Sequence, residues 1–163
     1  KLISFKIKQG EDYNFIYDQL VSYGEILSSV IISEYLNSIG LKSKWVDARS
    51  CIKTDQYYRD ANVDFEKTSK SIKRKIKGKG LFISQGFIGS NKKSYTTTLG
   101  REGSDYSAAI FAHALNAESV TIWKDVRGVL NADPRYFNKT KLLNKISYEE
   151  AIELAFYGAS VIH

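Results

Sequence analysis

A segment rich in glycine and threonine, GFIGSNKKSYTTTLGREGSD at residues 86–105, carries the strongest chemical signal in the sequence. Its glycines let the backbone approach a ligand closely, and its consecutive threonines supply hydroxyl groups. Arg101 presents a planar guanidinium that suits a carboxylate or a phosphate. A helix is expected to begin near Ser104, where free N–H groups and the helix dipole favour an anion. Asp105 then lies in the first helical turn, where it can orient a metal, a lysine or an ammonium group.

The same pattern also fits an ordinary capped helix that follows a glycine-rich turn. The segment contains neither the GxxxxGK[ST] motif of P-loop proteins nor the GxGxxG motif of dinucleotide-binding proteins. Its residues alone therefore leave the ligand-binding and the purely structural interpretations open.

A second polar segment, TIWKDVRGVLNADPRYF at residues 121–137, contains the only proline of the chain. Asp125 follows an expected strand directly, and Asp133-Pro134-Arg135 predicts a rigid turn that presents a carboxylate and a guanidinium. A carboxylate at a strand end can bind a ribose, and Arg135 can pair with a phosphate. Turns of this type are more often only turns, so both interpretations remain open.

The segment QLVSYGEILSS at residues 19–29 places Gly24 and Glu25 inside an expected helix. A glycine in the middle of a helix costs about 1 kcal/mol relative to alanine, and it is tolerated where another group must come close. Glu25 would lie beside that close approach. The alternative is a glycine that serves helix packing, next to a solvated glutamate.

The remaining pattern predicts the elements that position these residues. Asp64 is expected to cap a helix, and Ser147 with Glu150 forms a capping-box sequence. Apolar residues at a spacing of about 3.6 predict the first helix, and Gly40 and Gly158 are expected helix stops. The expected helices cover residues 12–39, 65–77, 104–115 and 147–157.

Short apolar and β-branched runs between these helices predict strands at residues 42–48, 81–87, 119–123 and 160–163, with loops at 49–63, 88–103 and 124–145. Strands that alternate with helices indicate an α/β fold, a three-layer α/β/α sandwich with a mostly parallel sheet. Ligands of such sheets bind beyond the carboxyl ends of the strands, and both polar segments follow a strand directly.

Composition favours one globular domain. The 163 residues are 43% hydrophobic and 26% charged, and no apolar run approaches the roughly 20 residues that a membrane helix needs. The start of the sequence lacks the apolar core of a secretory signal. The single cysteine suits a reducing compartment such as the cytoplasm, and one cysteine with two histidines makes a His/Cys metal site improbable.

The net charge of +6 is concentrated in residues 67–79, which hold seven basic residues and no acidic one. Two interpretations are open: a solvated helix face, and a patch for nucleic acid. Few aromatic residues accompany these charges, which favours the solvated face.

Four long motifs in fixed order resemble those of the aspartate kinases, within the wider amino-acid kinase family: SQGFIGS, TTTLGREGSDYSAA, WKDVRGVLNADPR and AIELAFYGASVIH. The resemblance extends from about residue 17 to residue 163. It implies phosphoryl transfer from MgATP to the side-chain carboxylate of L-aspartate, which gives 4-phospho-L-aspartate and opens lysine, threonine and methionine biosynthesis.

The resemblance also implies roles for individual residues. Glu25 would receive the substrate ammonium, and Arg101 would bind the substrate carboxylates with help from Ser104 and the backbone of Phe87. Asp105 would organise the reacting groups, so that catalysis is mostly positioning and charge stabilisation. The nucleotide, with Mg²⁺ carried by it, would be bound by Lys124, Asp125, Leu130, Asp133 and Arg135.

This sequence departs from the family pattern in several places. Many members have Thr-Asp and a nearby Tyr where this chain has Lys124-Asp125 and Leu130. The KFGGTS-like strand whose lysine grips the transferred phosphate is not in this sequence, nor are the regulatory ACT domains. We therefore expect a partial catalytic domain, residues 1–163, with little or no kinase activity alone. Homo-oligomer formation is expected through regions outside it.

Three other functions were weighed. A glutamate or acetylglutamate kinase would share the fold, but an acetylated substrate has no ammonium group for Glu25 to bind. A non-catalytic binding module could keep the fold without the reaction. A dinucleotide-dependent dehydrogenase is disfavoured because no GxGxxG follows any expected strand.

Overall fold

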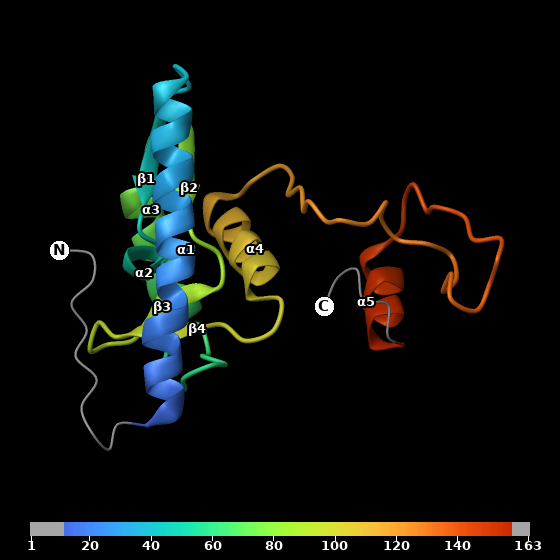
Figure 1. Cartoon of the computed structure of the whole chain (residues 1–163), viewed down its shortest axis with the longest axis horizontal. Coiled ribbons are helices and arrows are strands. Elements are labelled where there is room, and N and C mark those ends of the chain that lie inside the picture. The colour runs from blue at the N-terminus through green and yellow to red at the C-terminus, as the bar shows by residue number, and fades with distance from the viewer. Residues whose placement is uncertain (1–11, 158–163) are drawn as a thin grey trace. The chain divides into compact units, whose positions relative to one another are not determined.

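A computed structural model describes residues 12–157 of the chain. The chain divides into two compact units, Lys1–Val120 and Thr121–His163, and each is described by itself. Figure 1 shows the elements, which in the first unit are α1 Tyr13–Ser38, β1 Ser43–Val46, α2 Ala48–Cys51, α3 Phe65–Lys75, β2 Leu81–Ser84, β3 Ile88–Ser90, β4 Thr96–Thr98 and α4 Gly103–Leu115. The second unit contains α5, Tyr148–Phe156. Among residues 12–157, no helix combines the length and the apolar character that crossing a membrane requires.

The predicted helices are confirmed, and their caps form as their sequences indicate. The Asp12 side chain accepts a hydrogen bond from the backbone N–H of Phe15 and starts α1. Asp64 accepts from the N–H of Lys67 and starts α3. The capping box of α5 is complete, because Ser147 and Glu150 each accept from the backbone N–H of the other. Capping satisfies N–H groups that have no partner within the helix.

The strands β1 and β2 pair in parallel, with Ser43 opposite Leu81. Alternation along β1 sends Trp45 and Val46 to opposite faces. Trp45 packs against a cluster that contains Ile26 of α1. Val46 packs against a second cluster that contains Ile72 of α3 and residues of α4. The parallel sheet therefore lies between α1 and the α3–α4 pair, as in the predicted three layers.

Two predicted loops contain regular structure, so their description as loops was wrong. Within 88–103, β3 and β4 form an antiparallel hairpin with Ile88 opposite Thr98. The Asn91 side chain accepts hydrogen bonds from the N–H groups of Lys93 and Tyr95 and shapes the hairpin turn. The single turn of α2, Ala48–Cys51, extends into the start of 49–63 and is capped by Asp47. Elements of three or four residues are too short to show a hydrophobic period.

The predicted strand 119–123 was also wrong. These residues have no partner strand within the described part of the chain, and Trp123 is 90% exposed. A strand needs a neighbour for its backbone N–H and C=O groups, so a run of β-branched residues without one forms no ladder. The predicted helix stop at Gly158 and the predicted strand at 160–163 lie outside the described residues.

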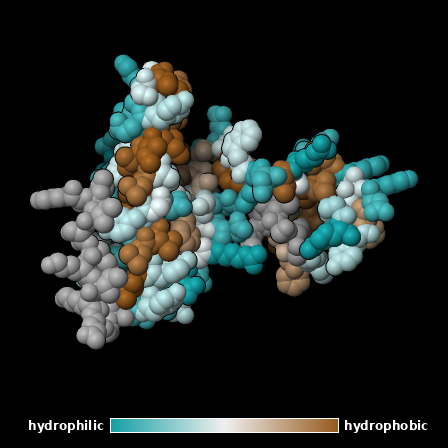
Figure 2. All heavy atoms as spheres, in the orientation of Figure 1, coloured by the Kyte–Doolittle hydropathy of each residue, from teal (hydrophilic) through white to brown (hydrophobic). Residues whose placement is uncertain are grey.

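The buried face of α1 is polar rather than apolar. Asp18, Ser22, Ile26, Ser29 and Ser33 recur at helical spacing and are all buried. The apolar series that predicted the helix is largely exposed on the opposite side: Leu20, Leu27, Ile31, Tyr35 and Ile39. Figure 2 shows hydrophobic surface along the length of α1. Hydrogen bonds, rather than apolar burial alone, therefore fix α1 on the sheet.

Candidate active site

The turn between β2 and β3 lies directly against the start of α4. A Cβ atom added at Gly86 would lie 2.9 Å from the Ser104 side chain, so only glycine fits between them. The backbone N–H of Phe87 donates to Ser107 Oγ at 2.9 Å and to the Gly103 carbonyl at 3.3 Å. Phe87 itself has a positive φ of 68°. Two predicted substrate-binding residues, Phe87 and Ser104, are thus adjacent.

The N-terminus of α4 has no side-chain cap. Its N-cap residue, Glu102, is in the left-handed conformation and makes no capping hydrogen bond. Gly103 fits tightly, because an added Cβ would lie 2.7 Å from the Phe87 ring. The side-chain cap that an ordinary capped helix would have is therefore not found at Glu102. An uncapped helix N-terminus favours an anionic ligand group.

Arg101 and Asp105 flank this N-terminus. Arg101 is exposed on the connection from β4 into α4, where Gly100 and Glu102 both have positive φ. Asp105 is half-buried in the first turn of α4, and its Oδ2 atom is shielded from solvent. A guanidinium and a carboxylate are therefore presented at opposite ends of one short segment, Arg101 to Asp105.

Glu25 is linked to this region through its neighbour on α1. Glu25 is half-buried, and Ile26 belongs to the buried cluster against which Phe87 packs. Gly24 is exposed, and no described atom of another element lies within 4 Å of a Cβ added there, so Gly24 does not serve helix packing. The close approach expected at Gly24 is likewise not seen among the described residues.

Asp18 is a residue of this framework that sequence reasoning missed. Its carboxylate is completely buried and accepts hydrogen bonds from the Thr98 N–H and the Thr98 hydroxyl, both at 2.8 Å. It also accepts from the backbone N–H of Arg59 at 3.0 Å. Asp18 therefore joins α1 to the end of β4, three residues before Arg101.

Two glutamines complete this polar framework. Gln19 donates to the Thr96 carbonyl at 2.8 Å and accepts from the Thr96 N–H at 3.1 Å. Gln85 accepts from the Ala48 N–H at 2.8 Å and donates to the Ser29 hydroxyl. For Asp18 and Gln19, the available signal was the helical spacing of the polar residues in α1, which matches that of the apolar ones. Gln85 follows β2, and the sequence around it gives no such signal.

The predicted nucleotide-binding residues all lie in the second unit. Arg135 donates to both oxygens of Asp133, with a closest distance of 2.7 Å, and this pairing lowers the pKa of Asp133. Leu130 forms a backbone bridge with Leu142. Asp125 is exposed and Lys124 is half-buried. A phosphate at Arg135 would therefore share its guanidinium with Asp133.

Within residues 12–157, no group of three or more histidine, cysteine, aspartate or glutamate side chains is placed to hold a metal ion. Cys51 is completely buried, and burial raises the pKa of its thiol.

The chain was compared with known proteins. The model of the amino acid kinase family matches residues 2–163. The lysine-sensitive aspartokinase 3 of Escherichia coli is 40% identical over 149 residues, which are 90% of this chain and 33% of that protein. A chloroplastic bifunctional aspartokinase/homoserine dehydrogenase 2 of Arabidopsis thaliana is 38% identical over 90% of this chain and 16% of that protein. The chain thus spans about a third or less of the length of these relatives.

Solved structures show the same likeness. The structure of E. coli aspartokinase III in complex with aspartate and ADP matches with a TM-score of 0.87 and 38% identity, over 95% of this chain and 35% of that one. The aspartate kinase of Clostridium acetobutylicum matches with a TM-score of 0.73 and 34% identity, over 89% of this chain and 32% of that one. These matches confirm the predicted α/β fold.

Proposed function

The chain belongs to the amino acid kinase family, and on this premise we propose that it forms part of an aspartate kinase. The reaction is transfer of a phosphoryl group from ATP to the side-chain carboxylate of L-aspartate, giving 4-phospho-L-aspartate. The similarity to E. coli aspartokinase III, whose structure was solved with aspartate and ADP, supports this proposal. A cytoplasmic location and homo-oligomer formation belong to the same proposal, as does its description as a partial catalytic domain.

The observation that carries the proposal is the position of Phe87 between the start of α4 and one buried cluster. The start of α4 lacks a side-chain cap, and Phe87 packs against the cluster that contains Ile26, the neighbour of Glu25 on α1. An amino acid substrate brings an ammonium group and two carboxylates to one place. A half-buried glutamate suits the ammonium, and an open helix N-terminus suits a carboxylate.

In this arrangement Arg101 binds the carboxylates of aspartate, and Glu25 binds its ammonium. Ser104 and the backbone of Phe87 line the site between them, since Gly86 and Gly103 bring these residues into contact. Asp105 holds the reacting groups in line from the first turn of α4. The chain then works through positioning and charge stabilisation, as is usual in phosphoryl transfer, and no covalent enzyme intermediate is required.

The second unit supplies the nucleotide contacts in this proposal. Lys124, Asp125 and Leu130 contact the adenosine, while Asp133 and Arg135 lie at the phosphates. Mg²⁺ arrives with the nucleotide and neutralises phosphate charge there. The Asp133–Arg135 pair keeps the guanidinium oriented before the nucleotide binds.

Glutamate kinase and acetylglutamate kinase activities are the competing proposals. Glu25 distinguishes aspartate kinase from acetylglutamate kinase. An acetylated amino group carries no positive charge and so forms no ion pair with the half-buried carboxylate of Glu25. Release of ADP, measured with aspartate, glutamate and acetylglutamate side by side in the full-length protein, decides among the three.

Binding of L-aspartate to the 163-residue chain, measured by calorimetry, tests the site directly. We expect binding of L-aspartate and none of N-acetyl-L-aspartate. Glu25→Gln should weaken binding at least tenfold, equivalent to about 1.4 kcal/mol. Glu34→Gln is the matched control, because Glu34 is an exposed glutamate of the same helix and should leave the affinity unchanged. Equal affinities for the Glu25→Gln variant and the unmodified chain would refute the site.

A further inference from the structure

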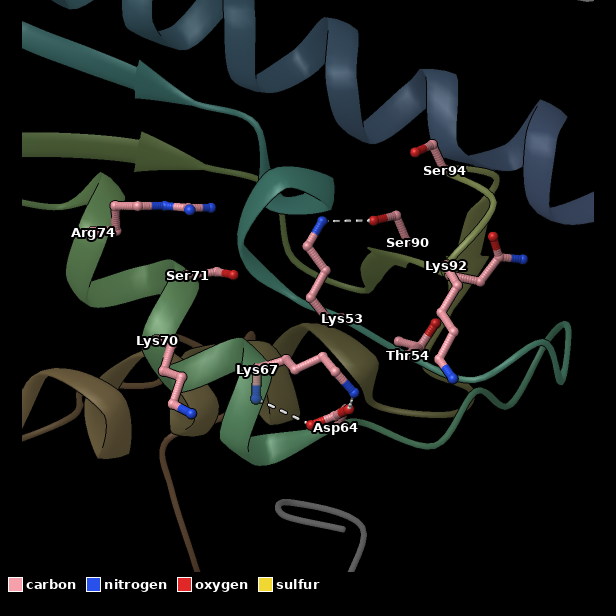
Figure 3. Close-up of a pocket in the computed structure, with 11 residues that line it drawn as sticks. Lys53, Thr54, Asp64, Lys67, Lys70, Ser71, Arg74, Ser90, Lys92 and Ser94 are labelled. Carbon is pink, nitrogen blue, oxygen red and sulfur yellow. Dashed lines mark hydrogen bonds and ion pairs between the residues drawn. The ribbon is translucent and has the colours of Figure 1, made fainter.

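A cleft of about 490 Å³ opens between α3 and the turn of the β3–β4 hairpin (Figure 3). Helix α3 forms one wall, the hairpin turn with Lys92 and Ser94 forms the other, and Lys53 lies between them. The residues that line it are Lys53, Thr54, Asp64, Lys67, Lys70, Ser71, Arg74, Ser90, Asn91, Lys92 and Ser94. None of them belongs to the proposed aspartate or nucleotide sites.

The lining of the cleft is strongly cationic. It contains five basic side chains and a single carboxylate, that of Asp64. Lys67 is paired with Asp64, and Lys70 is paired with Glu66 outside the cleft. Arg74 and Lys92 form no ion pair with any residue in the described part of the chain. Arg74 and Lys92 thus lie on opposite walls of the cleft without an ion pair, and Asp64, whose pKa is lowered mainly by Lys67 and in smaller part by Lys92, is the single carboxylate among five basic side chains.

Lys53 adds a partly desolvated charge at the base of the cleft. Its Nζ donates to the Arg49 carbonyl at 2.7 Å and to Ser90 Oγ at 3.0 Å. An ammonium group has three N–H donors, so one remains for a ligand. Burial lowers the pKa of Lys53, which means that the protonated form lacks solvation. An anion in the cleft would supply that missing stabilisation.

The cleft also divides the basic stretch 67–79 into two groups. Lys67, Lys70 and Arg74 are spaced at i, i+3 and i+7 on one face of α3 and line the cleft. The other basic residues of the stretch, including Lys73, do not line it. All seven basic residues of the stretch are exposed, as a solvated helix face predicts, but only three of them line a concavity.

We propose that this cleft binds a small compound that carries a diphosphate or triphosphate group. Its volume lies within the range of small-molecule sites, roughly 300–1,000 Å³. Cations on both walls match a ligand with several separated negative charges better than one carboxylate. The hydroxyl groups of Ser71 and Ser94 and the second N–H of the Asn91 amide add neutral donors for phosphate oxygens, whereas the Ser90 hydroxyl is already donated to the Arg49 carbonyl.

Calorimetric titration of the 163-residue chain with inorganic tripolyphosphate tests the proposal. The double variant Arg74→Gln/Lys92→Gln removes one unpaired cation from each wall and should weaken binding at least tenfold. The matched control is Lys73→Gln/Lys93→Gln, which changes the adjacent exposed lysines outside the cleft and alters the net charge equally. The control should bind within twofold of the unmodified chain. Equal weakening in both double variants, or no binding to the unmodified chain, would overturn the proposal.

Two further arms separate this site from others. Arg135→Gln changes the proposed nucleotide site and should leave tripolyphosphate binding intact. If the Arg135→Gln variant no longer binds tripolyphosphate, the assignment of this ligand to the cleft is overturned. The Arg74→Gln/Lys92→Gln variant should still bind L-aspartate. Binding of L-aspartate and binding of tripolyphosphate therefore test the two proposed sites independently. Titration with a nucleoside triphosphate and with a sugar that carries a diphosphate group identifies the source of the phosphate group. Stronger binding to a single-stranded oligonucleotide, weakened equally by both double variants, would instead indicate a nucleic-acid surface.

Discussion

Replacing the buried carboxylate of Asp18 should destabilise the first unit more than any other single change in α1. Its two oxygens receive hydrogen bonds from three donors: the Thr98 N–H, the Thr98 hydroxyl and the Arg59 N–H. In Asp18→Asn, the amide oxygen can keep the two backbone donors, and the Thr98 hydroxyl can rotate to accept from the amide. The substitution therefore removes charge from the network while keeping its shape.

The expected cost follows from the number of donors. A hydrogen bond to a charged group contributes roughly 1.5–3 kcal/mol, and a neutral one about 0.5–1.5 kcal/mol. The loss of charge at three donors, offset by the lower desolvation cost of an amide, should reduce the free energy of unfolding by about 2 kcal/mol. Asp18→Ala leaves buried donors without an acceptor and should cost about 4 kcal/mol. For a chain of this length, 2 kcal/mol corresponds to a fall in Tm of about 4–8 °C.

Urea unfolding followed by tryptophan fluorescence measures this effect. Trp45 is half-buried in the first unit and donates to the Ser29 hydroxyl at 3.0 Å, whereas Trp123 is in the second unit. A Trp123→Phe background therefore makes the signal specific to the first unit. Glu34→Gln is the same chemical change at an exposed site of α1 and should stay within about 0.5 kcal/mol. An unfolding midpoint of Asp18→Asn equal to that of Glu34→Gln would show that the Asp18 network contributes nothing.

Three further predictions concern separate features. Gly24→Ala should raise the free energy of unfolding by about 0.5–1 kcal/mol, because an added Cβ meets no described atom within 4 Å; a lower Tm would contradict the open space seen there. Cys51 is buried and burial raises the pKa of its thiol, so a disulfide reagent such as Ellman's should modify it only at the rate of unfolding; rapid reaction in the native protein would argue against its burial. The hydrogen bond from Lys67 lowers the pKa of Asp64, the N-cap of α3, below its ordinary value of 3.8. The stabilisation that the ionised cap provides is therefore fully present above the unfolded-state pKa, and it is lost as the pH falls through the folded-state pKa. The stability difference between the unmodified chain and Asp64→Ala should therefore shrink on acidification below about pH 4, as measured by thermal unfolding across pH, and a constant difference would contradict it.

The helices and their caps were predictable because their signals are local. Asp12, Asp64 and Ser147 each precede a helix and accept a backbone N–H within three residues. The glycine-rich segment could be proposed as a site for a similar reason, and that proposal stays a prediction. Residue types such as glycine and arginine determine which backbone conformations and which kinds of ligand the segment can accept, independently of distant parts of the chain.

The polar framework was not predictable because its contacts are long-range. Asp18 and Thr98 are 80 positions apart in sequence, and nothing near either residue indicates the other. The apolar residues of α1 give the period of the helix but not its buried side, since the polar residues have the same period. Strands of three residues, such as β3 and β4, likewise exist only because they pair with each other.

The position of Glu25 depends on Asp18, although the two side chains have different tasks. They are seven residues apart, which places them on nearly the same side of α1, about 10 Å apart along its axis. Asp18 is bonded to Thr98, and Arg101 follows Thr98 by three residues. One buried carboxylate thus fixes both the rotation of the helix that carries Glu25 and the start of the connection that carries Arg101. Rotating α1 by a single residue, about 100°, would carry Ile26 out of the cluster against which Phe87 packs and would also leave the donors of Thr98 without their acceptor. If the proposed aspartate site includes Glu25 and Arg101, Asp18 anchors both from two helical turns away, so Asp18→Asn should weaken aspartate binding even though Asp18 is not proposed to touch the ligand.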